Sequence, residues 1–318
     1  KNLLNVELVF NNLDSIKKLL VVPIGSCRKL YDRKSKGRDS NRYKEVSKKD
    51  IEILEIILNI KKLKYRKKNQ KMYLGSILDK KKLSLAIRGS DFVYHFAALA
   101  DMDFVRTRAL ESAKINIIGT INALVACNKH NVKRFIFASS IYANTEEGGF
   151  YGSSKKAAES YIERFHQTFG LKYTILRFGS LYGSRSDASN GLNIIINSAL
   201  KKQKLIYEGS INAARRYIHV EDAVNICAKV VNKKYENKYL TITGKRLVKI
   251  KNLMKMLSKY LNIPSNKIEY LNEYNIGHYD VKPTPFVNRS GKYLQIKKEK
   301  NFKKNLVYLV DELKKRQQ

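Results

Sequence analysis

The sequence predicts an α/β protein in which helices cover a doubly wound parallel sheet and a smaller lobe follows. Between residues 91 and 178, short apolar runs alternate with longer amphipathic segments, the pattern of strands joined by crossover helices. Beyond Gly183 this rhythm breaks, and helix-like segments are separated by Gly, Asn and Pro. Hydrophobic residues fill 43% of the 318 positions, which is enough for a sizeable core and too much for a disordered chain.

Short, largely apolar runs predict the strands of the sheet. An opening strand is expected at residues 19–24, with Gly25 forming the turn after it. The later strands are expected at residues 91–96, 134–138 and 173–178. The rest of residues 1–70 gives no clean period, because it contains charged runs such as 61–68.

Amphipathic segments predict the helices that cover these strands. The helices expected beside the sheet are 112–129 and 155–169, and those expected in the second lobe are 191–202, 221–232 and 247–261. We therefore expect a first domain at residues 1–178, of which 1–70 is divergent, and a smaller lobe at 179–318.

The net charge raises the question of a polyanionic partner. Lys and Arg number 63 against 28 Asp and Glu, which gives a formal charge of +35 and makes nucleic acid the first partner to weigh. Solvated Lys is the usual explanation of such an excess, and no zinc-finger, helix-turn-helix or aromatic RNA-reading motif accompanies it. Nucleic-acid binding through a basic surface therefore stays an alternative.

Cysteine usage and hydropathy bear on the compartment. Cys27, Cys127 and Cys227 stand alone, without CxxC pairing or His partners at ligand spacing, so neither a disulfide framework nor a metal site is expected. No stretch resembles a membrane span of ~20 apolar residues. We expect a cytoplasmic protein with no membrane partner.

Tyr151 and Lys155 form the first candidate for chemistry. They stand four residues apart where a helix is predicted to start, which places the phenol and the ammonium one turn apart on the same face. A neighbouring cation favours phenolate, so Tyr151 is a candidate general base. Ser139 and Ser140 end the preceding strand, at the carboxyl edge where α/β proteins place their sites.

Six segments in order resemble a known family, the extended short-chain dehydrogenase/reductases, and within it the NAD-dependent epimerase/dehydratase group that acts on nucleotide sugars. They are 91–98 (DFVYHFAA), 116–120 (NIIGT), 133–140 (KRFIFASS), 151–155 (YGSSK), 176–183 (LRFGSLYG) and 215–222 (RRYIHVED). The resemblance covers residues 72–245, and it implies a Rossmann-like NAD-binding domain followed by a substrate-binding lobe.

The resemblance also implies roles for individual residues. Tyr151 would be the acid/base, Lys155 would hold the nicotinamide ribose, and Ser140 would bond the reacting sugar hydroxyl, with Ser139 as the neighbouring substitute. The residues implied at the cofactor are Gly25, Ala97, Ala98, Asn116, Ser139 and Lys155. The residues implied at a nucleotide-diphosphate sugar are Asn116, Ser180 and Arg215, whose planar guanidinium suits a diphosphate.

The sequence departs from the family at its glycine-rich turn. The family opens with GxxGxxG, because pyrophosphate approaches backbone N–H groups at a helix N-terminus. Here Gly25 is followed by Arg28 and Tyr31 at the next two glycine positions. We therefore expect weaker NAD binding than in a relative with an intact loop, and tighter binding when Gly is restored at both positions.

The residues after Ser140 bear on the type of reaction. A dehydratase of this family would be expected to place Asp-Glu there to protonate the leaving hydroxyl and take a carbon-bound proton, but Ile141 and Tyr142 follow instead. Epimerisation with bound NAD is therefore favoured, with a sugar reductase or dehydrogenase as the enzymatic alternative. The resemblance also implies a homodimer formed through helices at residues 102–129 and 151–169.

Overall fold

A six-stranded parallel sheet forms the centre of the larger unit. The computed structural model describes residues 19–22, 73, 75–183, 186, 190–271, 291–293 and 299–316. Within these residues the strand order is β1-β2-β3-β4-β9-β12, and every neighbouring pair is parallel. The strands are β1 (Leu19–Val22), β2 (Phe92–His95), β3 (Arg134–Ser140), β4 (Tyr173–Phe178), β9 (Lys238–Ile242) and β12 (Gly291–Tyr293).

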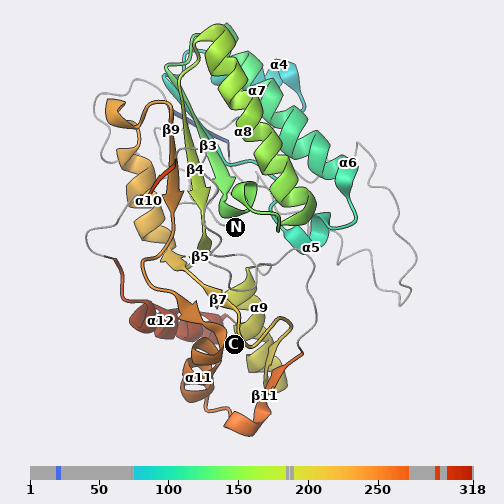
Figure 1. Ribbon diagram of the computed structural model, residues 1–318, viewed down its shortest axis with the longest axis vertical. Coiled ribbons are helices and arrows are strands. Elements are labelled where there is room, and N and C mark those ends of the chain that lie inside the picture. The colour runs from blue at the N-terminus through green and yellow to red at the C-terminus, as the bar shows by residue number, and fades with distance from the viewer. Residues whose placement is uncertain are drawn as a thin grey trace.

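Helices cover both faces of this sheet (Figure 1). On one face lie α4 (Lys80–Ile87), α7 (Gly119–Lys129) and α8 (Gly149–Phe169), and on the other lies α10 (Val220–Lys229). Alternation along β3 serves both faces, since Phe135 and Phe137 join the core under α7 and α8 while Ile136 joins the core under α10. This is the doubly wound α/β fold that the sequence predicts.

The crossover between β2 and β3 is a chain of short helices. It runs through α5 (Met102–Val105), α6 (Ala109–Ser112), the π-helix η2 (Ala113–Ile118) and α7. The predicted helix at 112–129 therefore exists, but residues Ala113–Ile118 follow a wider π turn. Such π segments are uncommon and often occur at functional sites.

The smaller lobe has its own core below the sheet (Figure 1). Its helices are α9 (Gly191–Lys202), α11 (Ile250–Leu261) and α12 (Phe302–Lys315), with the short 3₁₀ turn η5 (Ser265–Lys267). Three two-stranded sheets complete it: β6 (Leu205–Tyr207) with β11 (Ile268–Tyr270), β7 (Ala214–Arg215) with β10 (Val248–Lys249), and β5 (Ser180–Tyr182) with β8 (Tyr217–His219).

The chain passes between the two cores more than once. After leaving β4 for the smaller lobe, it returns through α10 and β9, whose side chains Val224, Leu240 and Ile242 belong to the core on the sheet. Residues 220–242 thus add to the first core, although the predicted boundary at 178 places them with the second. In the sheet β9 lies between β4 and β12, and its side chains are buried from Tyr239 to Ile242, as expected for a parallel strand covered on both faces.

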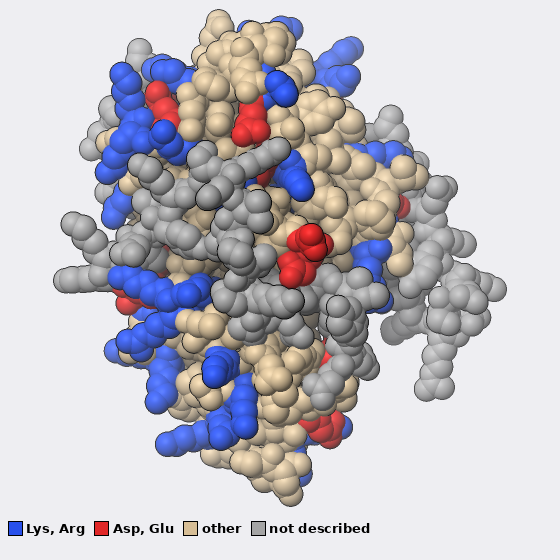
Figure 2. All heavy atoms as spheres, viewed as in Figure 1, with Lys and Arg blue, Asp and Glu red and all other residues tan. Residues whose placement is uncertain are grey.

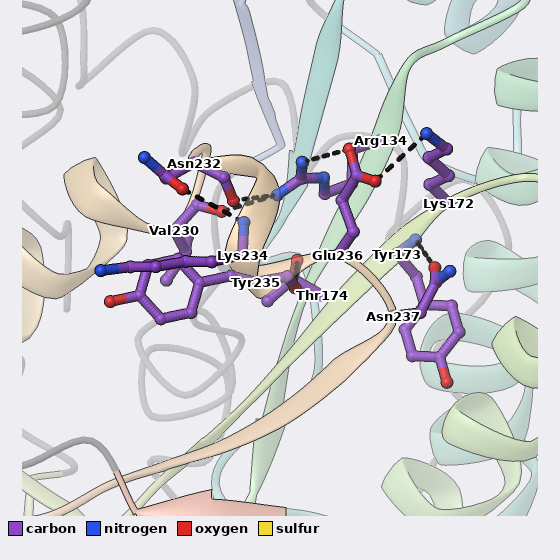
Figure 3. A network of polar contacts seen from close by, with 10 residues as sticks. All are labelled: Arg134, Lys172, Tyr173, Thr174, Val230, Asn232, Lys234, Tyr235, Glu236 and Asn237. Carbon is purple, nitrogen blue, oxygen red and sulfur yellow. Dashed lines mark hydrogen bonds and ion pairs between the residues drawn. The ribbon is translucent and has the colours of Figure 1, made fainter.

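A polar network holds the amino edge of the sheet (Figure 3). Arg134 at the start of β3 donates to the carbonyl oxygens of Val230 and Asn232, at 2.8 and 3.1 Å, just beyond α10. Its other terminal nitrogen contacts Glu236 at 2.7 Å, and Lys172 contacts the second oxygen of Glu236 at 3.1 Å. A cation at the C-terminus of a helix also complements the helix dipole.

Candidate active site

The candidate site lies at the carboxyl end of β3, where the strand meets the start of α8. Ser140 ends the strand, the 3₁₀ turn η3 (Ile141–Asn144) follows, and the chain returns to α8 through Gly148. Gly148 has φ +92, and a Cβ there would lie 2.7 Å from the Cβ of Tyr142. Glycine at this position therefore permits the tight return that brings the first turn of α8 back beside Ser140.

The structure brings Ser140, Tyr151 and Lys155 together, as the sequence predicts for a catalytic group. A side-chain hydrogen bond joins Tyr151 to Ser140, whose Oγ also accepts the backbone N–H of Tyr142 at 3.3 Å. Lys155 donates to the carbonyl oxygen of Ala138 at 2.7 Å, and its Nζ lies 5.8 Å from the centre of the Tyr151 ring. The ammonium is thus anchored to β3 while it faces the phenol.

Burial shifts the pKa values of this pair in opposite directions. It raises the pKa of Tyr151 to about 12, although the hydrogen bond with Ser140 acts the other way. It lowers the pKa of Lys155 to about 7, although the charge of Glu159 acts against that change. From the sequence, Lys155 is expected to lower the pKa of the phenol. In the protein alone, the loss of hydration has the larger effect and the pKa is raised.

Asn116 is buried and its side chain forms hydrogen bonds with neighbouring elements of the protein. Its Oδ1 accepts the N–H of Leu99 at 2.8 Å, while its Nδ2 donates to the carbonyl of Leu99 at 3.1 Å and to Ser154 Oγ at 2.9 Å. Ser154 in turn donates to the carbonyl of Tyr151 at 2.8 Å. Both amide protons of Asn116 are thus used, and the residue ties the π-helix and the loop after β2 to the first turn of α8.

Two small residues lie at the carboxyl end of β2. Ala97 and Ala98 are 8% and 3% exposed and precede Leu99, which Asn116 holds. Their methyl groups occupy little space at the edge of the sheet where ligands of α/β proteins bind. A role against a cofactor remains a prediction for both residues.

Two further predicted residues belong to the smaller lobe. Arg215 ends β7 and donates to the carbonyl of Ala214 at 3.1 Å and to the phenol oxygen of Tyr207 at 3.4 Å. Ser180 begins β5 and is half-buried. The carboxyl ends of β3 and β4 point toward this lobe (Figure 1), but the role of both residues at a substrate remains a prediction. Gly25 lies outside the described residues.

Several buried polar residues near the site were not among the predictions. Glu159 and Arg177 form a buried ion pair that also holds Ser139, and His95 Nε2 lies 3.0 Å from Thr120 Oγ1. The spacing of Glu159, four residues after Lys155, is the one indication that the sequence offers for it. The Ser139 hydroxyl faces this pair and donates to Glu159, so Ser140 is the better placed of the two serines for a substrate.

The described residues offer neither a metal site nor a membrane-spanning helix. No group of three or more His, Cys, Asp or Glu side chains in this part of the chain is arranged to hold a metal ion. In the same residues, no helix is both long and apolar enough to cross a bilayer. Cys127 and Cys227 are buried and unbridged.

Sequence comparison assigns the chain to a family. The model of the NAD dependent epimerase/dehydratase family matches residues 37–242, and the chain belongs to this family. A putative UDP-glucose 4-epimerase of Methanocaldococcus jannaschii is 30% identical over 173 residues, which are 49% of this chain and 56% of that protein. The human dTDP-D-glucose 4,6-dehydratase is 26% identical over 204 residues, 56% of this chain and 58% of that protein. The matches thus span little more than half the length of these curated relatives.

Comparison with solved structures confirms the fold. The crystal structure of UDP-glucose 4-epimerase with UDP-glucose from Thermotoga maritima superposes with a TM-score of 0.68 at 23% identity. The match covers 80% of this chain and 88% of that one. The extended short-chain dehydrogenase/reductase fold is therefore present from the sheet into the smaller lobe.

Proposed function

We propose that this chain is an NAD-dependent nucleotide-sugar epimerase, which oxidises one sugar carbon and reduces it again from the other face. The observation that carries the proposal is the group formed by Ser140, Tyr151 and Lys155 at the carboxyl end of β3. The family to which the chain belongs, and the epimerases among its relatives, support it.

Each member of this group has a definite task in the proposed reaction. The phenol oxygen of Tyr151, once deprotonated, accepts the proton of the sugar hydroxyl and later returns it. Ser140 forms a hydrogen bond with Tyr151 and would also bind the sugar hydroxyl, which places that hydroxyl beside the phenol oxygen. Lys155, when charged, stabilises the phenolate from one turn away.

The residues present fit the nicotinamide end of NAD. An ammonium carries three donors, and the hydrogen bond of Lys155 to the carbonyl of Ala138 uses one of them, which leaves donors for a ribose. Ala97 and Ala98 would border the ring with methyl groups alone. NAD, when bound, would supply the hydride acceptor and a positive charge beside the phenol.

The residues after Ser140 favour epimerisation over dehydration. In the structure Ile141 and Tyr142 form the 3₁₀ turn that follows β3, so the position next to Ser140 offers no carboxylate to act on a leaving hydroxyl. A dehydrogenase of a related sugar would use the same three residues and release the reduced cofactor, whereas a reductase would use them in the opposite direction and release the oxidised cofactor.

Nucleic-acid binding has less support. Figure 2 shows Lys and Arg on both lobes of one face, where they outnumber Asp and Glu. Several lysines of the described residues pair with nearby carboxylates, as Lys133 does with Asp91 at 2.9 Å and Lys204 with Glu269 at 3.0 Å. The distribution is that of a generally basic surface, so the charge favours no particular polyanion.

The test is turnover by the purified protein with NAD and three substrates offered separately. UDP-glucose or UDP-N-acetylglucosamine should yield the C4 epimer, with no net reduction of NAD. Accumulation of NADH would instead identify a dehydrogenase, and conversion of dTDP-glucose to a 4-keto-6-deoxy sugar would identify a dehydratase. No reaction with any of the three would contradict the proposal for these nucleotide sugars.

A further inference from the structure

Glu159 is a buried carboxylate with no task in the proposed reaction. It lies on α8 one turn beyond Lys155 and is 4% exposed, while its partner Arg177 on β4 is 2% exposed. Arg177 binds both carboxylate oxygens, with Nε to Oε1 at 2.9 Å and Nη2 to Oε2 at 2.6 Å. The hydroxyl of Ser139 donates to Oε1 at 2.6 Å, so one carboxylate joins three elements.

Three consecutive residues at the end of β3 each contact a different residue of α8. Ala138 accepts the ammonium of Lys155, Ser139 donates to Glu159, and Ser140 bonds Tyr151. Three consecutive residues of the strand are thus fixed by three residues spaced four apart on the helix. Ser139 lies between Ala138 and Ser140 on the strand. A displacement of its contact with Glu159 would therefore also move these two neighbours, which contact Lys155 and Tyr151.

Charge adds a second link between Glu159 and Lys155. The ionisable groups of the described residues that act on Lys155 are Glu159 and Tyr151 from α8 and His95 from β2, while Arg177 from β4 acts through Glu159. Of these, Glu159 alone carries a carboxylate. Without its charge, Lys155 and Arg177 would be two buried cations with no counter-charge.

We propose that Glu159 is a positioning residue for the reaction: its carboxylate holds the end of β3 through Ser139 and supplies the buried negative charge that balances the ammonium of Lys155. The effect on turnover rests on the proposed function. The effect on the charge of Lys155 does not, because it concerns the protein alone. A merely structural ion pair would change stability and leave the titration of Lys155 unaltered.

The first experiment follows the titration of Lys155 by NMR in protein carrying ¹³C at the Cε atoms of lysine, with Lys155→Met to assign the resonance. Glu159→Gln should lower the pKa of Lys155 by about one unit. Glu163→Gln, the same change one turn further along α8, is the matched control and should leave that pKa unchanged. A folded Glu159→Gln protein with the parent pKa would overturn the inference.

A double variant covers the case in which Glu159→Gln fails to fold. Glu159→Gln/Arg177→Met leaves neither member of the buried pair charged, a replacement that proteins often tolerate. The pKa of Lys155 should again fall, by less than in the single variant because the repulsion from Arg177 is also gone. An unchanged pKa in the folded double variant would contradict the proposal.

Turnover supplies the second readout. Ser139→Ala removes one hydroxyl from the contact and should lower kcat by about 10-fold, with little change in KM for the sugar nucleotide. An unchanged kcat would contradict the positioning role. If the parent protein shows no turnover, the proposed function fails, and the Lys155 titration still decides the charge role of Glu159.

Discussion

The phenol of Tyr151 is held between a hydroxyl and an ammonium, so a change confined to its oxygen tests the mechanism directly. Tyr151→Phe should lower epimerase activity by at least ~10²-fold and leave folding intact, because it removes only the oxygen from an otherwise apolar ring. Tyr161→Phe, at a 45% exposed position on the same helix, is the control for activity. Equal turnover by Tyr151→Phe and parent protein would remove Tyr151 from the mechanism.

Glu236 gives the molecule a pH-dependent contribution to stability. Partial burial would raise its pKa, but hydrogen bonds from Lys172 and Arg134 outweigh burial and lower it. A lowered pKa means that this stabilisation is complete above the ordinary pKa of glutamate and is lost as the pH falls through the folded-state value.

The corresponding variant is Glu236→Gln, which leaves the buried guanidinium of Arg134 without its anion. It should lower the free energy of unfolding by about 1–3 kcal/mol at pH 7. The difference from the parent protein should shrink as the pH falls below the ordinary pKa of glutamate and through the lowered folded-state pKa, where the carboxylate gains its proton. Urea unfolding at several pH values measures it, with the exposed Glu146→Gln as control. A difference independent of pH would contradict the argument.

At the scale of elements, two helix-starting glycines should respond in opposite ways to alanine. A Cβ at Gly119 would lie 2.3 Å from Cδ1 of the buried Ile77, whereas nothing lies within 4 Å of a Cβ at Gly191. Gly119→Ala should cost about 1–3 kcal/mol through overpacking. Gly191→Ala should stabilise by up to about 1 kcal/mol, because alanine loses less backbone entropy. The denaturant midpoints of the two variants measure these changes in stability. Equal shifts would contradict the explanation by packing around Gly119.

The helices and strands predicted within residues 91–261 are present, but α8 begins at Gly149 rather than at 155, and the short strands of the smaller lobe and β9 were not predicted. The strand at 173–178 and the helix at 191–202 have the predicted bounds, because apolar runs and flanking glycines mark their ends. The π turn at Ala113–Ile118 has no such marker, since it differs from an α-helix only in which carbonyl each N–H reaches.

The sequence predicts the close approach of Ser140, Tyr151 and Lys155, but it does not predict the buried contacts that support these residues. Tyr151 and Lys155 carry a short-range spacing, which a single sequence displays. The pairing of Glu159 with Arg177 joins residues 18 positions apart through the register of β3 and β4, which no local pattern encodes. The glycine-poor turn after β1 stays a prediction, since Gly25, Arg28 and Tyr31 lie outside the described residues.

At the scale of the whole molecule, the outer face of the α6–α8 layer is apolar enough to be covered. Large hydrophobic side chains are exposed on it, namely Leu110, Ile118, Val125, Phe150 and Tyr161. Ala158 on the same helix is buried against the sheet and does not add to this face. The homodimer expected through these helices therefore has side chains available to form it.

Sedimentation tests this dimer. The parent protein should sediment as a dimer at micromolar concentration, and Val125→Glu should weaken association at least ~10-fold by placing a charge in the apolar contact. Tyr308→Glu, at a 59% exposed position on α12, is the matched control and should leave association unchanged. A monomeric parent protein would count against the dimer.

Because the chain returns from the smaller lobe to form β9, residues 1–178 alone do not contain the whole central sheet. β9 pairs with β4 from Thr174 to Phe178, so a fragment ending at residue 178 would lack the strand that satisfies one side of β4. It would expose a row of free backbone donors and acceptors on the run YTILRF, and such an exposed edge strand tends to pair with another chain. Size-exclusion chromatography should therefore find fragment 1–178 aggregated. A soluble monomeric fragment would mean that the first core folds independently.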